Sequence, residues 1–117
     1  MISIDDFKKL EIKIGCIKSA EKIAGSDKLL KLSIDMGEEF LRQIVSGISA
    51  YFPEPETLIG KKCAFATNLE PRLIMSLESQ GMILAVSGGE GDGRFFSLLE
   101  VSNDVLPGST VKWFCIF

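Results

Sequence analysis

The sequence predicts a single all-β domain in which five to seven short strands close into a small barrel. Two observations point to this fold class. Apolar and polar residues alternate over short runs, most regularly from Leu30 to Met36, and clusters of glycine, proline, asparagine and aspartate separate these runs. The length of 117 residues is that of one domain, and neither a repeat nor a linker divides residues 1–117.

The elements can be placed in order along the chain. A short helix is expected first, because Ser3 can cap it and Asp5 and Asp6 then occupy the first turn, where the helix dipole favours anions. Strands are predicted over residues 11–23, 30–36, 40–46, 62–67, 82–86, 95–99 and 111–117. Between them we expect a loop with one short helical turn at 49–60, an irregular segment at 68–80 and a mobile, glycine-rich hairpin loop at 87–93. This pattern is typical of a Greek-key or OB-like barrel, and a β-sandwich is the alternative.

The composition argues against several classes of function. The chain contains no histidine, so it lacks the commonest general base and any Ser-His or Cys-His nucleophile. Its three cysteines, Cys16, Cys63 and Cys115, are far apart and have no partners at zinc-ligand spacing. We therefore expect no catalysis by this chain, no metal and no cofactor. No apolar run approaches about 18 residues and no cationic leader is present, so we expect a soluble, cytoplasmic protein without a membrane partner.

The charge is unevenly distributed. The net charge is −3 and the sequence pI is about 5.0, which by itself disfavours a nucleic-acid partner. Residues 1–31 hold seven lysines and five acids, whereas residues 32–117 hold six cations and eleven acids. The first segment is therefore net positive by two, and a modest basic face is compatible with the sequence. A scatter of solvated lysines would give the same numbers.

Several polar side chains near strand ends are suited to a phosphate-containing ligand. Lys28 and Lys31 lie at the start of the second predicted strand, and Arg42 lies on the third. Asn68 and Arg72 leave a strand on either side of a rigid proline; an asparagine can read nucleotide edges, and an arginine can bind phosphate or stack on a base. The alternatives are solvated strand ends for the cations and a loop amide that satisfies the backbone for Asn68.

Ser79-Gln80-Gly81-Met82 is the most informative short segment. It places a hydroxyl, an amide and a polarisable thioether beside a glycine, where the backbone of a ligand could approach closely. Without further context the same four residues also fit a simple turn that enters a strand.

Seven short motifs follow one another in the order, and with compatible spacing, of one known family. They are Ile4-Asp5-Asp6-Phe7, Glu11-Ile12-Lys13-Ile14-Gly15, Ser26-Asp27-Lys28-Leu29, Gln43-Ile44-Val45-Ser46-Gly47-Ile48, Leu58-Ile59-Gly60-Lys61-Lys62, Asn68-Leu69-Glu70-Pro71-Arg72 and Ser79-Gln80-Gly81-Met82. Over residues 4–113 the chain thus resembles the tRNA-binding domain family, which occurs at the C-terminus of bacterial methionyl-tRNA synthetases and as free-standing structure-specific tRNA-binding proteins.

The resemblance implies both a fold and a function. The implied fold is a five-stranded OB-fold Greek-key barrel with a C-terminal extension. The implied function is non-catalytic binding to the outer corner of folded tRNA by a homodimer, which raises the tRNA affinity of an attached or associated synthetase. The partners implied are therefore tRNA, a second copy of the chain and the catalytic region of methionyl-tRNA synthetase.

Family contacts carried over by position identify eight candidate tRNA-binding residues: Lys28, Lys31, Arg42, Asn68, Arg72, Ser79, Gln80 and Met82. The chain departs from the family at Leu73 and Met75, where two further cations are usual. Each lost phosphate contact lowers affinity and makes its salt dependence shallower. With the net charge of −3, we therefore expect weak or accessory tRNA binding.

The C-terminal residues Trp113-Phe114-Cys115-Ile116-Phe117 are unusually apolar for a chain end. Burying such a side chain stabilises a protein by about 1.5–3 kcal/mol, so we expect these residues to be covered. They could complete the barrel core or pack in a two-fold interface, and the resemblance favours the interface for Trp113, Phe114, Ile116 and Phe117.

Two rival functions use the same fold. One branch of the fold family resembles a protein-export chaperone, so the chain could instead be a dimeric peptide-binding module. Alternatively, Leu73, Met75 and the acidic pI fit a dimerisation domain whose RNA surface has decayed.

Overall fold

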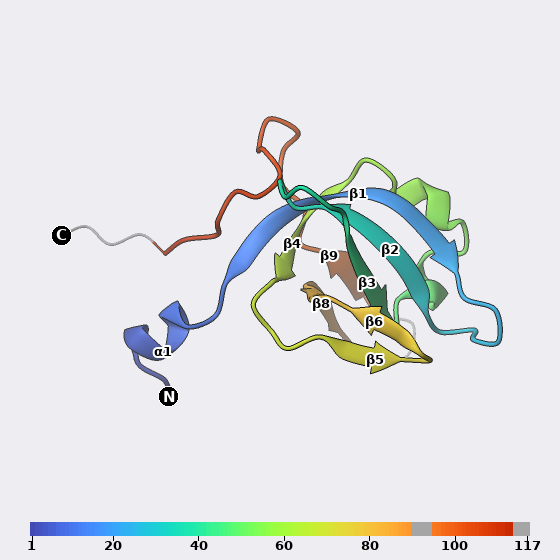
Figure 1. Cartoon of the computed structure of the whole chain (residues 1–117), viewed down its shortest axis with the longest axis horizontal. Coiled ribbons are helices and arrows are strands. Elements are labelled where there is room, and N and C mark those ends of the chain that lie inside the picture. Colours follow the sequence, from blue (N-terminus) through green and yellow to red (C-terminus); the bar gives the residue numbers. More distant parts are fainter. Residues whose placement is uncertain (90–94, 114–117) are drawn as a thin grey trace.

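The computed structural model describes residues 1–89 and 95–113 (Figure 1). Its elements follow the order α1 (Ile4–Lys8), β1 (Ile12–Lys22), β2 (Leu30–Asp35), β3 (Arg42–Ser46), the 3-10 turns η1 (Ser49–Tyr51) and η2 (Pro55–Leu58), β4 (Lys62–Ala66), β5 (Arg72–Ile74), β6 (Leu77–Ser79), β7 (Met82–Ile83), β8 (Ala85–Gly88) and β9 (Phe95–Leu98). No helix in the described residues is long and apolar enough to cross a membrane.

Five antiparallel strands form the barrel, in the spatial order β3-β2-β1-β4-β7 (Figure 1). The long strand β1 is shared between two neighbours. Its first half pairs with β4, from Ile12 opposite Ala66 to Cys16 opposite Lys62, and its second half pairs with β2. An irregularity between Ile17 and Ser19 shifts the register at the changeover. Such a bulge bends a strand, which lets β1 curve around the barrel.

The core is built by the alternation that the sequence shows most clearly. Leu30, Leu32 and Ile34 on β2 are fully buried, and the residues between them are only partly so. They pack with Ile44 from β3, Phe65 from β4 and further residues of the core cluster. Gly15 on β1 makes room for this packing, because a Cβ at that position would collide with the side chains of Ile34 and Met36.

The predicted OB-like barrel is confirmed, and so is the helix at the start. Ser3 caps α1 through its hydroxyl, which accepts a hydrogen bond from the Asp6 backbone N–H, and the Asp6 carboxylate accepts one from the Ser3 backbone N–H in return. The strands predicted at 11–23, 30–36, 40–46, 62–67 and 95–99 correspond to β1 to β4 and β9 within a few residues.

Four expectations from the sequence were wrong in detail. Residues 49–60 contain two 3-10 turns and not one helical turn. The segment at 68–80 is irregular only over residues 68–71, because residues 72–79 form the β5–β6 hairpin. The strand expected at 82–86 is divided: Met82–Ile83 pairs with β4, and Ala85–Gly88 leaves the barrel sheet to pair with β9. The loop expected to be mobile at 87–93 overlaps β8, and its residues 90–93 lie outside the described residues.

The last predicted strand is also corrected over the part that can be seen. Residues 111–113 form no strand; instead a single bridge joins Thr110 to Lys13, and the Val111 N–H donates to the Ile12 carbonyl at 2.8 Å. This segment runs beside the start of β1 (Figure 1). It brings the ring centroid of Trp113 to 6.2 Å from the ring centroid of Phe7 in α1. Residues 114–117 lie outside the described part of the chain.

Candidate functional site

Ser79 joins the β5–β6 hairpin to the edge of β3. Its hydroxyl accepts a hydrogen bond from the Val45 N–H at 3.0 Å and donates one to the Gly81 carbonyl at 3.1 Å. The residue is only 5% exposed. The side chain therefore supplies the partner that a neighbouring strand would normally give to the Val45 N–H.

Gln80 continues this connection along β3. Its side-chain Oε1 accepts from the Gln43 N–H at 2.9 Å, and its own backbone N–H donates to the Gln43 carbonyl at 2.8 Å. The Gln43 amide in turn donates to the Glu78 carbonyl at 2.9 Å. We call this set of contacts between residues 43–45 and 78–81 the seam. It closes the barrel largely through side chains, at the place where the ladder of backbone hydrogen bonds stops.

Gly81 is required by the path of the chain at the seam. Its φ is +141°, a conformation that residues with a Cβ rarely adopt, and a Cβ there would lie 2.8 Å from the Ala66 carbonyl oxygen. The next residue, Met82, pairs with Ala66 in β7 and leaves its side chain 48% exposed. In the segment 79–82, Ser79 and Gln80 therefore close the barrel, and Met82 presents an exposed side chain.

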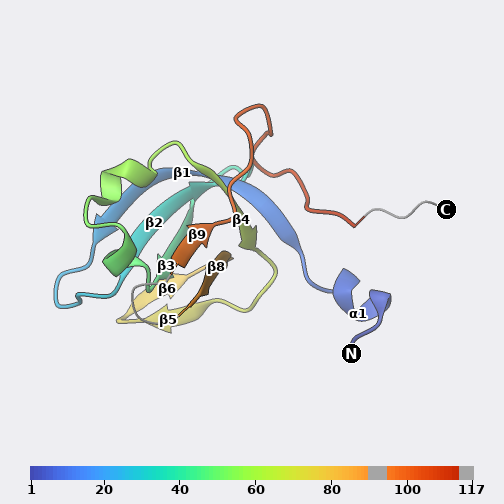
Figure 2. The same cartoon turned by 180° about the vertical axis from the view of Figure 1, so that it is seen from behind.

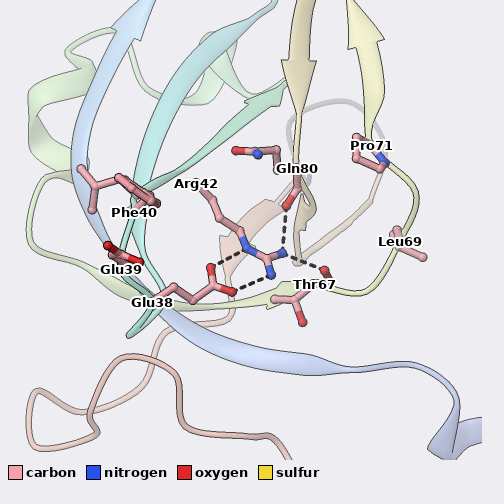
Figure 3. A pocket seen from close by; sticks show the side chains of 9 residues that line it. Glu38, Glu39, Phe40, Arg42, Thr67, Leu69, Pro71 and Gln80 are labelled. Carbon is pink, nitrogen blue, oxygen red and sulfur yellow. Dashed lines mark hydrogen bonds and ion pairs between the residues drawn. The ribbon is translucent and has the colours of Figure 1, made fainter.

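Arg42 occupies the middle of a groove of about 490 Å³ between residues 38–42 and residues 67–71 (Figure 3). Its guanidinium donates to both carboxylate oxygens of Glu38, at 2.8 and 3.0 Å, and to the carbonyls of Thr67 and Gln80, at 2.7 and 3.1 Å. The hydrogen bonds with Arg42 lower the pKa of Glu38, and the same contact raises the pKa of Arg42. Most of the N–H donors of Arg42 are therefore engaged in hydrogen bonds within the protein, and its positive charge is paired with the Glu38 carboxylate.

Asn68 fixes the start of β1 to the end of β4. Its Oδ1 accepts from the Glu11 N–H at 2.7 Å, and its Nδ2 donates to the Lys9 carbonyl at 2.6 Å. The neighbouring Thr67 hydroxyl donates to the Glu11 carboxylate at 2.8 Å. Asn68 is an exposed residue, but both ends of its amide are occupied.

The three remaining cationic candidates differ in whether their side chains are already paired within the protein. The exposed Lys28 and Arg72 have side chains that make no hydrogen bond or ion pair among residues 1–89 and 95–113. Lys31 lies 3.2 Å from the Glu21 carboxylate and is partly neutralised by it. The structure thus separates the eight candidates into exposed side chains (Lys28, Arg72, Met82), an ion-paired one (Lys31) and four that hold the fold together (Arg42, Asn68, Ser79, Gln80).

The β5–β6 hairpin carries Arg72 and approaches the loop that carries Lys28. Arg72 begins β5, and the turn at Met75–Ser76 brings the Met75 methyl group within 3.8 Å of the position that a Cβ would take at Gly25, in the loop that also carries Lys28. Leu73 is 78% exposed on this hairpin. Leu73 and Met75, the two positions at which the resemblance led us to expect cations, therefore present apolar side chains to solvent.

Sequence reasoning missed two participants, Gln43 and Glu38. Gln43 stood in a quoted motif without a role, and its only local signal is a polar residue within a strand. Glu38 forms the ion pair with Arg42. An acidic residue four positions before an arginine was the pattern in the sequence that could have indicated this pair.

Trp113 is the only one of the four predicted interface residues within the described part of the chain. It is 43% exposed; its ring meets Phe7 edge to face, and the Lys8 ammonium lies 5.0 Å from the ring centroid. Phe114, Ile116 and Phe117 lie outside the described residues.

The described residues offer little for metal or thiol chemistry. They contain no group of three or more histidine, cysteine, aspartate or glutamate side chains arranged around one point. Cys16 and Cys63 are buried and free, and burial raises the pKa of the Cys63 thiol to about 12. A thiol with that pKa stays protonated and is a poor nucleophile.

Comparison with known proteins gives one family. A family model described as "Putative tRNA binding domain" matches residues 12–110. A methionine–tRNA ligase of Caldanaerobacter subterraneus is 46% identical over 95% of this chain, and one of Methanoregula boonei is 49% identical over 96%. The chain spans about 16% of the length of these curated relatives.

Solved structures agree with this result. A MetRS-related protein from Pyrococcus horikoshii is 39% identical with a TM-score of 0.83, and the match covers 96% of this chain and 98% of that one. The chaperone CsaA from Bacillus anthracis is 26% identical with a TM-score of 0.78, over 96% of this chain and 99% of that one.

Proposed function

The chain belongs to the putative tRNA-binding domain family, and from this membership we propose that it binds the outer corner of folded tRNA without catalysing a reaction. It does so in the cytoplasm as a C-terminal module, or a free-standing relative, of methionyl-tRNA synthetase. The observation that carries the proposal is the match over residues 12–110, which includes every candidate contact residue.

The direct contacts are assigned to the exposed side chains. Arg72 and Lys28 bind phosphate groups, because both are exposed cations without an acidic partner in the described part of the chain. Met82 packs its thioether on the RNA beside them. The hairpin that carries Arg72 meets the Gly25–Lys28 loop at Met75, which supports placing these contacts on one face.

Four candidates act indirectly, because their polar groups are engaged in hydrogen bonds within the protein: Ser79, Gln80, Arg42 and Asn68. The first three hold the β5–β6 hairpin and the start of β7 against β3, and Asn68 holds the start of β1 to the end of β4. Lys31 contributes less than Lys28, since the Glu21 carboxylate competes with phosphate for it.

The expected affinity is low. Exposed Leu73 and Met75 stand where the resemblance implies cations, and the net charge of −3 opposes the approach of a polyanion. An accessory module of this kind raises the affinity of a synthetase for tRNA without binding tightly on its own.

A second copy of the chain is the proposed partner for the surface around α1. Ile4, Leu10, Val111 and Trp113 are exposed apolar side chains on α1 and the segments next to it. Trp113 would lie in a two-fold interface together with Phe114, Ile116 and Phe117, which follow it in the sequence.

Filter binding of total tRNA across a range of salt concentrations tests the proposal. Arg72→Ala and Lys28→Ala should each weaken binding and reduce the slope of log K against log salt by about 0.9. Lys61→Ala is the matched control, because Lys61 already pairs with Glu100 at 3.2 Å. Absence of binding by the unaltered chain even at low salt would contradict the proposal.

Two alternatives each have an observation in their favour. The likeness to CsaA and the exposed Phe40 and Leu41 beside the Arg42 groove favour peptide binding, and suppression of client aggregation without tRNA retention would establish it. The exposed Leu73 and Met75 favour a dimerisation domain with a decayed RNA surface. That reading predicts unchanged tRNA affinity in Arg72→Ala and Lys28→Ala and loss of the dimer on removal of residues 111–117.

A further inference from the structure

An aromatic groove lies between η1 and the β8–β9 hairpin. Tyr51 and Phe52 border it from the η1 side, and Phe95 and Phe96 border it from β9. Its volume of about 500 Å³ is within the range of about 300–1,000 Å³ typical of ligand sites. None of the eight candidate contact residues lines this groove.

The rings of the groove are held in fixed orientations. Tyr51 stacks on Phe96 with the ring centroids 4.0 Å apart and the planes 7° from parallel, and Phe52 meets Phe96 edge to face at 5.9 Å. Phe95 lies across Gly88, where a Cβ would come within 2.8 Å of the Phe95 Cζ atom. A ligand would therefore meet rings whose rotational freedom has already been lost.

Two of the four rings, Tyr51 and Phe95, do not cover the barrel core. Phe52 and Phe96 pack against the core cluster and cover it at this end. Tyr51 and Phe95 remain 53% and 56% exposed. One face of the Tyr51 ring is covered by Phe96, and its hydroxyl makes no hydrogen bond within the described residues. An oriented ring with one free face and a polar tip is suited to stacking on a planar heterocycle.

The charged residues near the groove favour a phosphate group on the Lys28 side and disfavour one on the Glu54 side. The Ser49 N–H, at the start of η1, donates to the Lys28 carbonyl at 3.0 Å. The loop that carries the exposed Lys28 is therefore bonded to the turn that carries Tyr51. Glu54 lies with Tyr51 in a separate depression and would repel phosphate there. The backbone of an RNA would thus pass on the Lys28 side.

We propose that the groove between Tyr51 and Phe95 binds one unpaired nucleobase of the RNA, stacked on the free face of Tyr51, while Lys28 binds the adjoining phosphate. This site rests on the proposed function and extends the tRNA surface from the β5–β6 hairpin to η1. Stacking is tolerant of base identity, so the site adds affinity without sequence preference.

Tyr51→Leu and Phe95→Leu, which keep apolar bulk but remove the aromatic face, test the site by filter binding of total tRNA. Each should weaken binding by about 5- to 100-fold with an unchanged salt slope, because no phosphate contact is lost. Tyr51→Phe is the matched control and should bind within about twofold of the unaltered chain. Cooperative thermal unfolding of each variant shows that the fold persists. Irradiating a complex with tRNA transcribed with 5-iodouridine should cross-link Tyr51 or Phe95, as located by mass spectrometry.

The outcomes separate this site from the proposed function. If Arg72→Ala weakens tRNA binding while Tyr51→Leu and Phe95→Leu bind like the unaltered chain, the stacking site is wrong and the tRNA function stands. Cross-links confined to other peptides would also overturn the site. If the two leucine variants lose affinity for an unfolded polypeptide and keep it for tRNA, the groove binds peptide. If the unaltered chain binds no tRNA at low salt, both proposals fail together.

Discussion

Gly81 shows how much one residue controls at the seam. The Gly81→Ala variant should lower the free energy of unfolding by about 2–3 kcal/mol, because a Cβ meets the Ala66 carbonyl and the positive φ becomes strained. Urea denaturation measures the change. Gly47→Ala is the control, since no atom lies within 4 Å of the Cβ it would gain; an equal loss in that variant would show that the seam geometry is not the cause.

The Glu38–Arg42 pair should make a small contribution to stability that depends on pH. Hydrogen bonds from Arg42 lower the folded-state pKa of Glu38 below its ordinary value of 4.5. The stabilisation is therefore complete above about pH 4.5 and is lost as the pH falls through the folded-state pKa. Because Glu38 is exposed, the effect should be about 0.5 kcal/mol.

Denaturation at pH 7 and at pH 3 measures this contribution. Glu38→Gln should be less stable than the unaltered chain at pH 7, and the difference should shrink at pH 3. The neighbouring Glu39→Gln serves as the control, because Glu39 has no ion pair among residues 1–89 and 95–113. A difference at pH 3 as large as at pH 7 would contradict the assignment.

At the residue scale the sequence assigned one role to eight side chains that the structure places in different environments. All eight candidates were expected at the RNA surface, yet Ser79 and Gln80 bond to Val45 and Gln43, more than thirty positions away in the chain. Local patterns carry no information about such distant partners. The tRNA contacts of Lys28, Arg72 and Met82 remain predictions.

At the scale of elements, the seam gives the β5–β6 hairpin its position. Ser79→Ala should leave the Val45 N–H without a partner and destabilise the protein by about 1–3 kcal/mol. Hydrogen exchange at the Val45 amide should become faster and tRNA affinity should fall, although Ser79 itself touches no RNA in our assignment. Ser46→Ala on the same strand is the control; unchanged exchange at Val45 in Ser79→Ala would refute the role of the hydroxyl.

The β5–β6 turn is strained, because Met75 and Ser76 both have positive φ, at 50° and 66°. Replacing the pair with Asn-Gly, which such two-residue turns prefer, should stabilise the protein by about 1–2 kcal/mol in urea denaturation. Ser76→Ala keeps a Cβ and should gain nothing. A gain of the same size in that control would point to a cause other than the backbone.

The elements that the sequence revealed are those with a strong local signal. β2 alternates without exception and Ser3 begins a capping box, so both were predicted within a residue or two. The β5–β6 hairpin was missed because Met75-Ser76 is an unusual pair for its turn type. Val111 follows β1 through single hydrogen bonds and forms no strand, a distinction that depends on tertiary contacts and not on local composition.

At the scale of the whole molecule, the surface around α1 leads to a prediction about assembly. The unaltered chain should sediment as a dimer, and Trp113→Ala should shift the equilibrium toward monomer, because Trp113 and its exposed apolar neighbours would be covered in the interface. Analytical ultracentrifugation at several concentrations measures the shift. Phe40→Ala, far from α1 in the sequence and also exposed, is the control; a monomeric unaltered chain would contradict the interface.

The contact between Phe7 and Trp113 also determines how the domain can be tethered. α1 and the segment ending at Trp113 lie side by side, at the opposite end of the molecule from the β5–β6 turn (Figures 1 and 2). The segment before β1 and the segment that ends at Trp113 therefore reach the barrel at the same end of the described fold. A synthetase joined through either segment would hold the proposed RNA surface directed away from the joint, and the tether would raise the effective concentration of tRNA in both cases.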